Sequence, residues 1–186
     1  ASIDQNGFSP VWSPGRDRLA FFSKERDGTQ VYVATVLIDP NVAARDRTSE
    51  QTQPVRITND SDQKRTLSWS PDGTKIAYIA YASNISNSVL KVINLVTSDV
   101  ILLTNPRMGM TNDAVWLDNE NLLVTLINDQ GSNVHLVALD GSSAEPFVPF
   151  ESREPTISPS GHRVALSTPN GIFTMTRNGS DAKQLT

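Results

Sequence analysis

The chain has 186 residues and a mass of 20.3 kDa, enough to bury about 70% of the surface that the unfolded chain exposes. Its 16 Lys and Arg against 20 Asp and Glu give a net charge of −4, the wrong sign for gripping phosphate backbones, so we expect no nucleic-acid partner. The absence of cysteine excludes disulfides, thiolate metal sites and cysteine nucleophiles. No apolar run approaches the ~20 residues that cross a bilayer, and the first residues do not read as a signal peptide, so we expect no membrane insertion.

A repeated motif divides the chain into four units. Residues 8–15 (FSPVWSPG) recur as 66–73 (TLSWSPDG), in eroded form as 112–120 (NDAVWLDNE), and as 155–161 (PTISPSG). With Trp12, Trp69, Trp116 and Ile157 as equivalent positions, the steps are 57, 47 and 41 residues, near the ~40 to 45 residues of a four-stranded propeller blade. The predicted units are 1–58, 59–104, 105–150 and 151–186, within a single domain over 1–186. The long first step indicates an inserted polar loop at 39–53, with 42–51 as a candidate short helix.

Each unit contains the same series of predicted strands after its motif. A short apolar run comes first and is too rich in β-branched and aromatic residues for a helix, at 18–23, 75–81, 121–127 and 162–167. A run with alternating polarity follows, at 30–36, 89–95, 133–139 and 171–177. The unit closes with 54–58, 99–104, 145–150 and 182–186, where prolines at 54, 146 and 149 fit an outer edge strand.

The turn residues agree with this division into hairpins. Asp72-Gly73 and Ser160-Gly161 join first to second strands, and Asp140-Gly141 and Asn178-Gly179 join third to fourth strands. Hairpins at this spacing predict an all-β fold, a β-propeller of four four-stranded antiparallel blades.

The residues also resemble a known family. Residues 69–78 (WSPDGTKIAY), a third strand, an Asp-Gly or Asn-Gly turn and a closing QLT or RIT are similar to the WD-repeat-like blades of TolB-type β-propellers. The resemblance covers nearly the whole chain and is weakest in the third unit. It implies functions that range from protein contacts in a periplasmic envelope complex to the propellers of dipeptidyl and prolyl peptidases. Family members usually have more than four blades.

Because only four blades are present, three arrangements stay open: a closed four-bladed ring, a segment of a larger propeller, and an open half-ring paired with another copy. An open array would expose apolar sheet faces, which favours self-association.

The sequence lacks the motifs of several kinds of chemistry. Residues 141–145 (GSSAE) miss the second glycine of a nucleophile elbow, and His135 and His162 have no metal-ligand spacing. Asp60 and Asp62 lack the glycine and distal Glu of a calcium loop, and no phosphate-binding glycine loop occurs. We therefore predict no catalytic residue, no metal site and no cofactor. A small-molecule or ion site on the propeller axis is a third, weaker hypothesis.

The remaining candidates lie on loops that a propeller gathers at one end. These loops mix charges of both signs with apolar side chains, which suits a protein or peptide partner. The predicted partner-binding residues are Asp60, Asp62, Lys64, Arg65, Arg107, Met108, Asp129 and Arg153. We predict a noncatalytic protein-interaction or sensor module, extracytoplasmic in a bacterium by resemblance to TolB-like repeats. The alternative is a propeller segment that gates a serine peptidase whose hydrolase domain lies outside this chain.

Overall fold

The computed structural model describes residues 7–36, 53–82 and 87–186 of the chain. They form four antiparallel sheets of four strands each, and each sheet follows chain order from its first strand to its last. This confirms the all-β, four-bladed prediction. The candidate helix at 42–51 and most of the predicted loop at 39–53 lie outside the described residues.

We number the sheets as blades 1 to 4. Blade 1 contains β1 (Gly7–Trp12), β2 (Arg18–Glu25), β3 (Gly28–Thr35) and β4 (Val55–Arg56). Blade 2 contains β5 (Gln63–Trp69), β6 (Lys75–Tyr81), β7 (Val89–Asn94) and β8 (Val100–Leu102). Blade 3 contains β9 (Met110–Trp116), β10 (Asn121–Asn128), β11 (Gly131–Ala138) and β12 (Ala144–Pro146), preceded by the 3-10 turn η2 (Pro106–Met108). Blade 4 contains β13 (Arg153–Ile157), β14 (Arg163–Thr168), β15 (Gly171–Thr176) and β16 (Lys183–Gln184).

The fourth strands are shorter than the sequence pattern indicates. They have two or three residues in every blade and lie at the outer edge, where each pairs with the third strand on one side only. Pro146 closes β12, on the outer edge where its missing N–H costs nothing.

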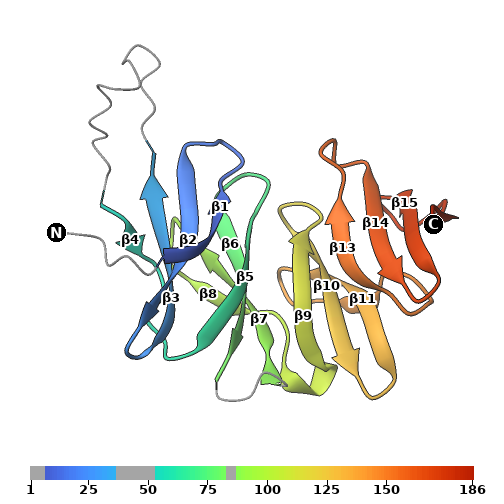
Figure 1. The fold of residues 1–186 in the computed structure, drawn as a ribbon, viewed down its shortest axis with the longest axis horizontal. Coiled ribbons are helices and arrows are strands. Elements are labelled where there is room, and N and C mark those ends of the chain that lie inside the picture. Colours follow the sequence, from blue (N-terminus) through green and yellow to red (C-terminus); the bar gives the residue numbers. More distant parts are fainter. Residues whose placement is uncertain (1–6, 37–52, 83–86) are drawn as a thin grey trace, which may run out of the picture.

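The blades stack in a row, and a separate apolar core fills each seam between neighbours. Ala20, Phe22 and Val31 of blade 1 pack with Trp69 and Ile76 of blade 2. Corresponding clusters join blade 2 to blade 3 and blade 3 to blade 4. No cluster of the described residues joins blade 4 to blade 1, and Figure 1 shows these blades at opposite ends of an open arc. The described residues therefore do not close into a four-bladed ring.

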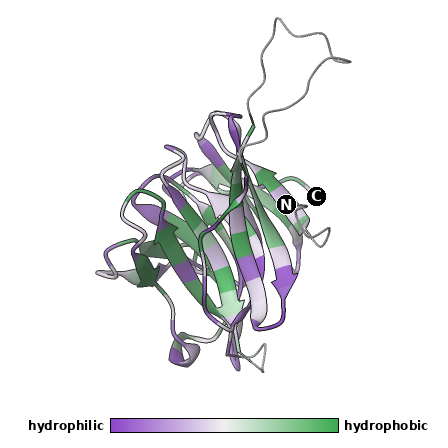
Figure 2. Ribbon diagram, turned by 90° about the vertical axis from the view of Figure 1, so that its left-hand side faces the viewer, coloured by the Kyte–Doolittle hydropathy of each residue, from purple (hydrophilic) through white to green (hydrophobic). Residues whose placement is uncertain are grey.

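The strands alternate their faces as the period of two predicts. Figure 2 shows green and purple bands along the strands, because one side chain enters a seam and the next meets a different surface. We call the side of a blade that faces the next blade its forward face, and the opposite side its backward face.

Trp69 and Trp116 sit on backward faces and are 7% and 4% exposed. Trp12 occupies the same register, since it pairs with Leu19 as Trp69 pairs with Ile76, but it is 51% exposed. Trp69 and Trp116 therefore join neighbouring sheets, whereas Trp12 does not, because the described residues place no blade behind blade 1.

Candidate protein-binding surface

The loops that the sequence singles out lie along one edge of the arc, at the same end of the strands in each blade. This end carries the β2–β3, β10–β11 and β14–β15 turns and the connections 57–62, 103–109 and 147–152, along the lower edge of Figure 1. We call this end the loop face. Its connections lie tightly against the turns: a Cβ on Gly28 would come within 2.8 Å of the Ser61 carbonyl oxygen, and one on Gly109 within 2.6 Å of that of Ile127. Both glycines have positive φ, so close approach and backbone conformation together require glycine there.

Lys64 anchors the connection between blades 1 and 2. Its side chain is fully buried, and its ammonium group donates to the Thr29 carbonyl oxygen at 2.8 Å and to the Asp62 carbonyl oxygen at 3.2 Å. It also forms an ion pair with the Asp60 carboxylate. Because its ammonium group is buried and already bonded to three oxygens of this chain, Lys64 is not available to a partner. Its role is to fix the loop that carries the two aspartates.

Asp60 and Asp62 share a second cation, Lys91. The Lys91 ammonium group lies 2.7 Å from the Asp62 carboxylate and 3.4 Å from that of Asp60. Partial burial by itself would raise the pKa of Asp60, but the hydrogen bond from Lys64 and the charges of both lysines outweigh it and lower that pKa. For Lys91, burial acts to lower the pKa, and its two carboxylate partners raise it above the ordinary value. Two carboxylates, Asp60 and Asp62, and two ammonium groups, Lys64 and Lys91, therefore form one network of ion pairs and hydrogen bonds at this seam.

Arg65 projects the other way, across the seam to blade 3. One guanidinium nitrogen donates to the Thr111 carbonyl oxygen at 2.8 Å, and its Nε is buried without a partner. The neighbouring Asp113 is mostly enclosed, and burial raises its pKa, helped by the charge of Glu154 and opposed by the Ala114 N–H and by Arg65. The first strands of blades 2, 3 and 4 thus bring one cation, Arg65, and two carboxylates, Asp113 and Glu154, close enough to interact.

A third group of candidates lies where η2 meets the β10–β11 turn. Arg107 and Asp129 are exposed, and Met108 is partly buried against the core between blades 2 and 3. Asn105 caps η2 by accepting from the Arg107 N–H at 3.0 Å. Gly109 brings this segment against the end of β10, so an arginine, a methionine and an aspartate lie on adjoining loops.

Arg153 stands apart from the others, exposed at the start of β13. A β-bulge follows it directly, as one follows Arg65 in β5, and bulges re-aim side chains at the ends of strands. The predicted binding residues therefore do not converge on one spot. They follow the loop face along three successive seams.

Sequence reasoning missed Lys91 and the side chains that lock the loops. Gln30 donates to the Asp60 carbonyl oxygen at 2.7 Å, and Thr58 accepts from the Val31 N–H at 2.9 Å. Thr104, Ser152 and Thr186 accept from the third strand of their own blades in the same way. The Leu-Thr or Ile-Thr pair that closes three of the four units could have indicated this contact. A threonine hydroxyl at that position can accept the hydrogen bond that a backbone carbonyl of the fourth strand would otherwise accept.

A hollow lies beside one of these loops, and another lies away from them on blade 4. One, of about 300 Å³, lies beside Asp60 on the outer side of the first seam and is lined by Arg56, Ile57, Thr58, Asn59, Asp60, Tyr78, Ser98 and Val100. The Tyr78 hydroxyl is buried without a hydrogen-bond partner, and burial together with the charges of Asp60 and Asp62 raises the pKa of Tyr78.

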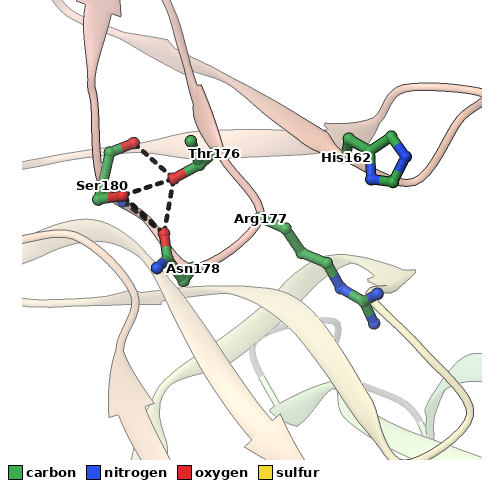
Figure 3. A pocket seen from close by; sticks show the side chains of 5 residues that line it. All are labelled: His162, Thr176, Arg177, Asn178 and Ser180. Atoms are coloured by element: carbon green, nitrogen blue, oxygen red, sulfur yellow. Dashed lines mark hydrogen bonds between the residues drawn. The ribbon is translucent and has the colours of Figure 1, made fainter.

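The other hollow, of about 460 Å³, lies on blade 4 at the opposite end of the arc and includes His162 and Arg177. Figure 3 shows Thr176, Asn178 and Ser180 bonded to one another, while the His162 and Arg177 side chains stand to one side. Arg177 is already paired with Asp118 at 2.7 Å. The polar groups of this hollow thus stabilise a turn and a seam.

Within the described ranges, no three carboxylate or imidazole groups gather to hold a metal ion. The described chain contains no helix long and apolar enough to cross a membrane.

No family model and no curated protein sequence matches this chain. Solved structures do. The putative TolB from Agrobacterium tumefaciens has a TM-score of 0.69 at 18% identity, over 94% of this chain and 63% of that one. Oligogalacturonate lyase in complex with manganese has a TM-score of 0.72 at 11% identity, over 100% of this chain and 55% of that one. Dipeptidyl peptidase 4 from Porphyromonas gingivalis has a TM-score of 0.68 at 12% identity, over 100% of this chain and 33% of that one.

At these identities the likeness concerns the fold, and the chain spans less than two thirds of the length of each structure. The repeat, the four blades and these neighbours together show that the chain has the fold of a TolB-like β-propeller.

Proposed function

We propose that the chain is a noncatalytic protein-interaction or sensor module that binds a protein or peptide across its loop face. The observation that carries the proposal is a rigid frame with exposed charges on it. Lys64, Gln30 and Thr58 fix the first connection from inside, while Arg107, Asp129 and Arg153 stay exposed on the same end. Side chains on a fixed loop lose little entropy on binding, so such a surface suits recognition.

The composition of the loop face favours a polypeptide partner. Arginine and methionine are enriched in protein interfaces, and Arg107 and Met108 lie side by side in η2. Acidic groups at Asp60, Asp62 and Asp129 alternate with the arginines along the arc. Charges of both signs in alternation favour a partner that presents both signs as well.

The noncatalytic role is supported by how the polar groups are used. His135 lies on β11 with its Nδ1 3.2 Å from the Asn133 carbonyl oxygen, and His162 is exposed after a turn. The two histidines are on different blades, and neither has a serine or carboxylate partner among the bonds of the described residues. By resemblance to TolB-like repeats, we place the module outside the cytoplasm of a bacterium.

The test is affinity capture from cell-envelope extract of the source organism, with quantitative mass spectrometry. The wild-type chain is compared with Arg107→Glu/Arg153→Glu on the loop face and with Arg163→Glu/Lys183→Glu on blade 4 away from it. Both double variants change the charge by the same amount. Loss of specific partners from the loop-face variant alone supports the proposal. Equal recovery by all three chains, or equal loss from both variants, contradicts it.

A second function is favoured by one observation. The solved neighbours include dipeptidyl peptidase 4 and puromycin hydrolase, of which this chain covers 33% and 30%. In this alternative, the blades are part of a propeller that gates a serine peptidase. A gene product that continues into a segment with a G-x-S-x-G elbow would decide for it.

A further inference from the structure

A buried hydroxyl in the first seam has no hydrogen-bond partner within the described part of the chain. Tyr78 lies on β6, on the backward face of blade 2, and is 1% exposed. Burial and the charges of Asp60 and Asp62 raise the pKa of Tyr78, so the hydroxyl keeps its proton at neutral pH. In the unfolded chain water bonds to this group, and folding leaves it unpaired at a cost in stability.

The other blades have no hydroxyl at this position. The equivalents of Tyr78 are Phe21, Val124 and Leu166, because each lies two residues after the residue that pairs with the tryptophan position, or with Ile157 in blade 4. Val124 and Leu166 are 0% and 1% exposed and fill the next two seams. An apolar side chain therefore meets the packing need at this position, and packing does not explain the hydroxyl.

The Tyr78 hydroxyl lies toward the hollow of about 300 Å³ on the outer side of the first seam. Tyr78 and Asp60 both line this hollow. Since the Asp60 charge acts on the Tyr78 hydroxyl, the hydroxyl end of the ring is the part near this carboxylate. Tyr78 forms the floor, and the exposed residues Asn59, Ser98 and Val100 form the rim. The volume is at the lower end of the range for ligand pockets, about 300–1,000 Å³, and suits a small molecule.

Both walls of the hollow are held in place by side chains. On one wall, the Thr58 hydroxyl donates to the Gln30 side-chain oxygen at 2.8 Å, and Gln30 donates to the Asp60 carbonyl oxygen at 2.7 Å. On the other wall, the Asn94 side chain accepts from two N–H groups of the β7–β8 turn at 2.8 and 3.2 Å. The Asn94 carbonyl oxygen accepts from the Ser98 N–H at 2.8 Å. A ligand therefore meets a site that is already ordered.

The charged groups at the hollow already have partners of opposite charge. The Arg56 guanidinium lies 3.0 Å from the Glu25 carboxylate and 3.6 Å from that of Asp27. The Asp60 carboxylate is paired with the two lysines of the seam. A ligand with a net charge would find no free counter-ion here and would still lose its own hydration. This disfavours phosphates, carboxylates and amines as ligands.

The groups that stay free are mostly neutral. Besides the Tyr78 hydroxyl, the Asn59 amide and the Ser98 hydroxyl make no hydrogen bond within the ranges that the structure describes. One Asp60 carboxylate oxygen has a single contact, at 3.4 Å from Lys91. The hollow also includes apolar surface, from Ile57 and from Val100, which is 51% exposed. Hydroxyl groups both donate and accept, so a molecule with several of them can pair with all of these polar groups.

We propose that this hollow binds a neutral sugar, with one ring hydroxyl accepting from Tyr78 and donating to the Asp60 carboxylate. The Asn59 amide and the Ser98 hydroxyl bond to further hydroxyls at the rim, and the C–H groups of the sugar pack on Ile57. An apolar ligand would leave the Tyr78 hydroxyl unpaired, and an ion would lack a counter-charge. This inference does not rest on the protein partner of the loop face.

The experiment is a saturation-transfer NMR titration of the 186-residue chain with D-glucose, D-galactose and D-mannose. We expect saturable binding of at least one of them, with a Kd below about 10 mM. For the sugar that binds best, the 6-carboxylate and 2-amino analogues should bind at least about tenfold more weakly, because they bring an unpaired charge. Cyclohexanol, which keeps the ring but has one hydroxyl, should also bind more weakly.

Tyr78→Phe is the decisive variant, because it removes one oxygen and keeps the ring. It should weaken sugar binding at least about tenfold. Without sugar, its midpoint of urea unfolding should equal or exceed that of the wild type, since the lost hydroxyl had no partner. Asn59→Ala, at the rim, should weaken binding less. Tyr81→Phe, on the same strand but outside the hollow, is the matched control and should bind as the wild type does.

Four results overturn the proposal. They are the failure of all three neutral sugars to saturate the wild type, equal binding by Tyr78→Phe, tighter binding of a charged analogue, and a lower urea midpoint for Tyr78→Phe without sugar. Affinity capture separates this proposal from that of the loop face. Tyr78→Phe should recover the same protein partners as the wild type, and their loss would assign the hollow to a protein interface in place of a sugar.

Discussion

The indole nitrogen of Trp69 donates to the carbonyl oxygen of Val11, 3.0 Å away across the seam between blades 1 and 2. Trp116 and Ser68 make the same bond at the next seam. A large apolar ring with one donor can fill a seam and also satisfy a backbone acceptor there, so it fixes both the spacing and the register of neighbouring blades. The fourth unit has Ile157 at this position, which has no donor, and its seam combines apolar packing with the Arg177–Asp118 ion pair.

This relationship predicts different consequences for the same substitution at two equivalent positions. Trp69→Phe should lower the free energy of unfolding by about 1–2 kcal/mol, because it removes a buried hydrogen bond and part of the ring. Trp12→Phe should change it by less than about 0.5 kcal/mol, because that ring is half exposed. Urea unfolding followed by circular dichroism measures both. Equal losses would show that Trp12 is packed in solution.

The buried Lys64 predicts a stability effect at a residue first identified as a binding candidate. Lys64→Met keeps the apolar length of the side chain but leaves the Thr29 and Asp62 carbonyl oxygens and the Asp60 carboxylate without this donor. We expect the free energy of unfolding to fall by about 2–4 kcal/mol. This is less than for a fully buried ion pair, because Asp60 is partly exposed and keeps its contact with Lys91. Lys24→Met, at an exposed position, is the control and should be nearly neutral. Thermal unfolding of both variants distinguishes a structural lysine from a binding one.

Two aspartates near the third blade should respond to pH with opposite signs. Burial raises the pKa of Asp113 above its ordinary value of 3.8, so folding favours its neutral form. Its stabilising contribution is present below the ordinary value and is lost as pH rises through the raised pKa. Asp113→Asn should therefore increase stability at neutral pH, and the gain should vanish in acid.

Asp118 is the matched control for Asp113. Burial acts to raise the pKa of Asp118, but hydrogen bonds from Glu120, Asn121 and Arg177 outweigh it and lower the pKa. Its contribution is present above the ordinary value and is lost as pH falls through the lowered pKa. Asp118→Asn should therefore decrease stability at neutral pH. Unfolding midpoints from pH 3 to 8 (roughly the range in which carboxylates titrate) test both signs, and a shift of the same sign in the two variants would contradict the assignment.

Replacing a buried threonine by valine should have opposite effects on stability at Thr125 and at Thr104. The Thr125 hydroxyl is buried without a partner, at a position where blades 1 and 2 have Phe22 and Ile79. Thr125→Val should stabilise the fold by about 1 kcal/mol. The Thr104 hydroxyl accepts from the Leu90 N–H at 2.7 Å, so Thr104→Val should cost about 1–3 kcal/mol. Denaturant unfolding decides, and a destabilised Thr125→Val would indicate a water or another group bonded to that hydroxyl.

Much of this fold follows from local sequence. Strand alternation, Asp-Gly and Asn-Gly turns, and the recurring Trp-Ser-Pro motif depend on a few consecutive residues, so they predicted the four sheets and the TolB-like propeller fold. The loops that carry Asp60, Arg107 and Arg153 could also be placed on one end, because strand order fixes where each connection lies.

The role of individual side chains depended on what faces them across a seam. Trp12 and Trp69 stand in nearly identical local sequence, yet one is half exposed and the other buried, since exposure depends on the neighbouring blade. Lys64 reads as a surface charge in a polar segment, but Thr29 and Asp62 surround it, and Lys91 joins the same network from another strand. The sequence by itself determined the strands, the turns and their repetition. The tertiary structure alone decided which of the repeated groups were paired, because burial and pairing arise between segments far apart in the chain.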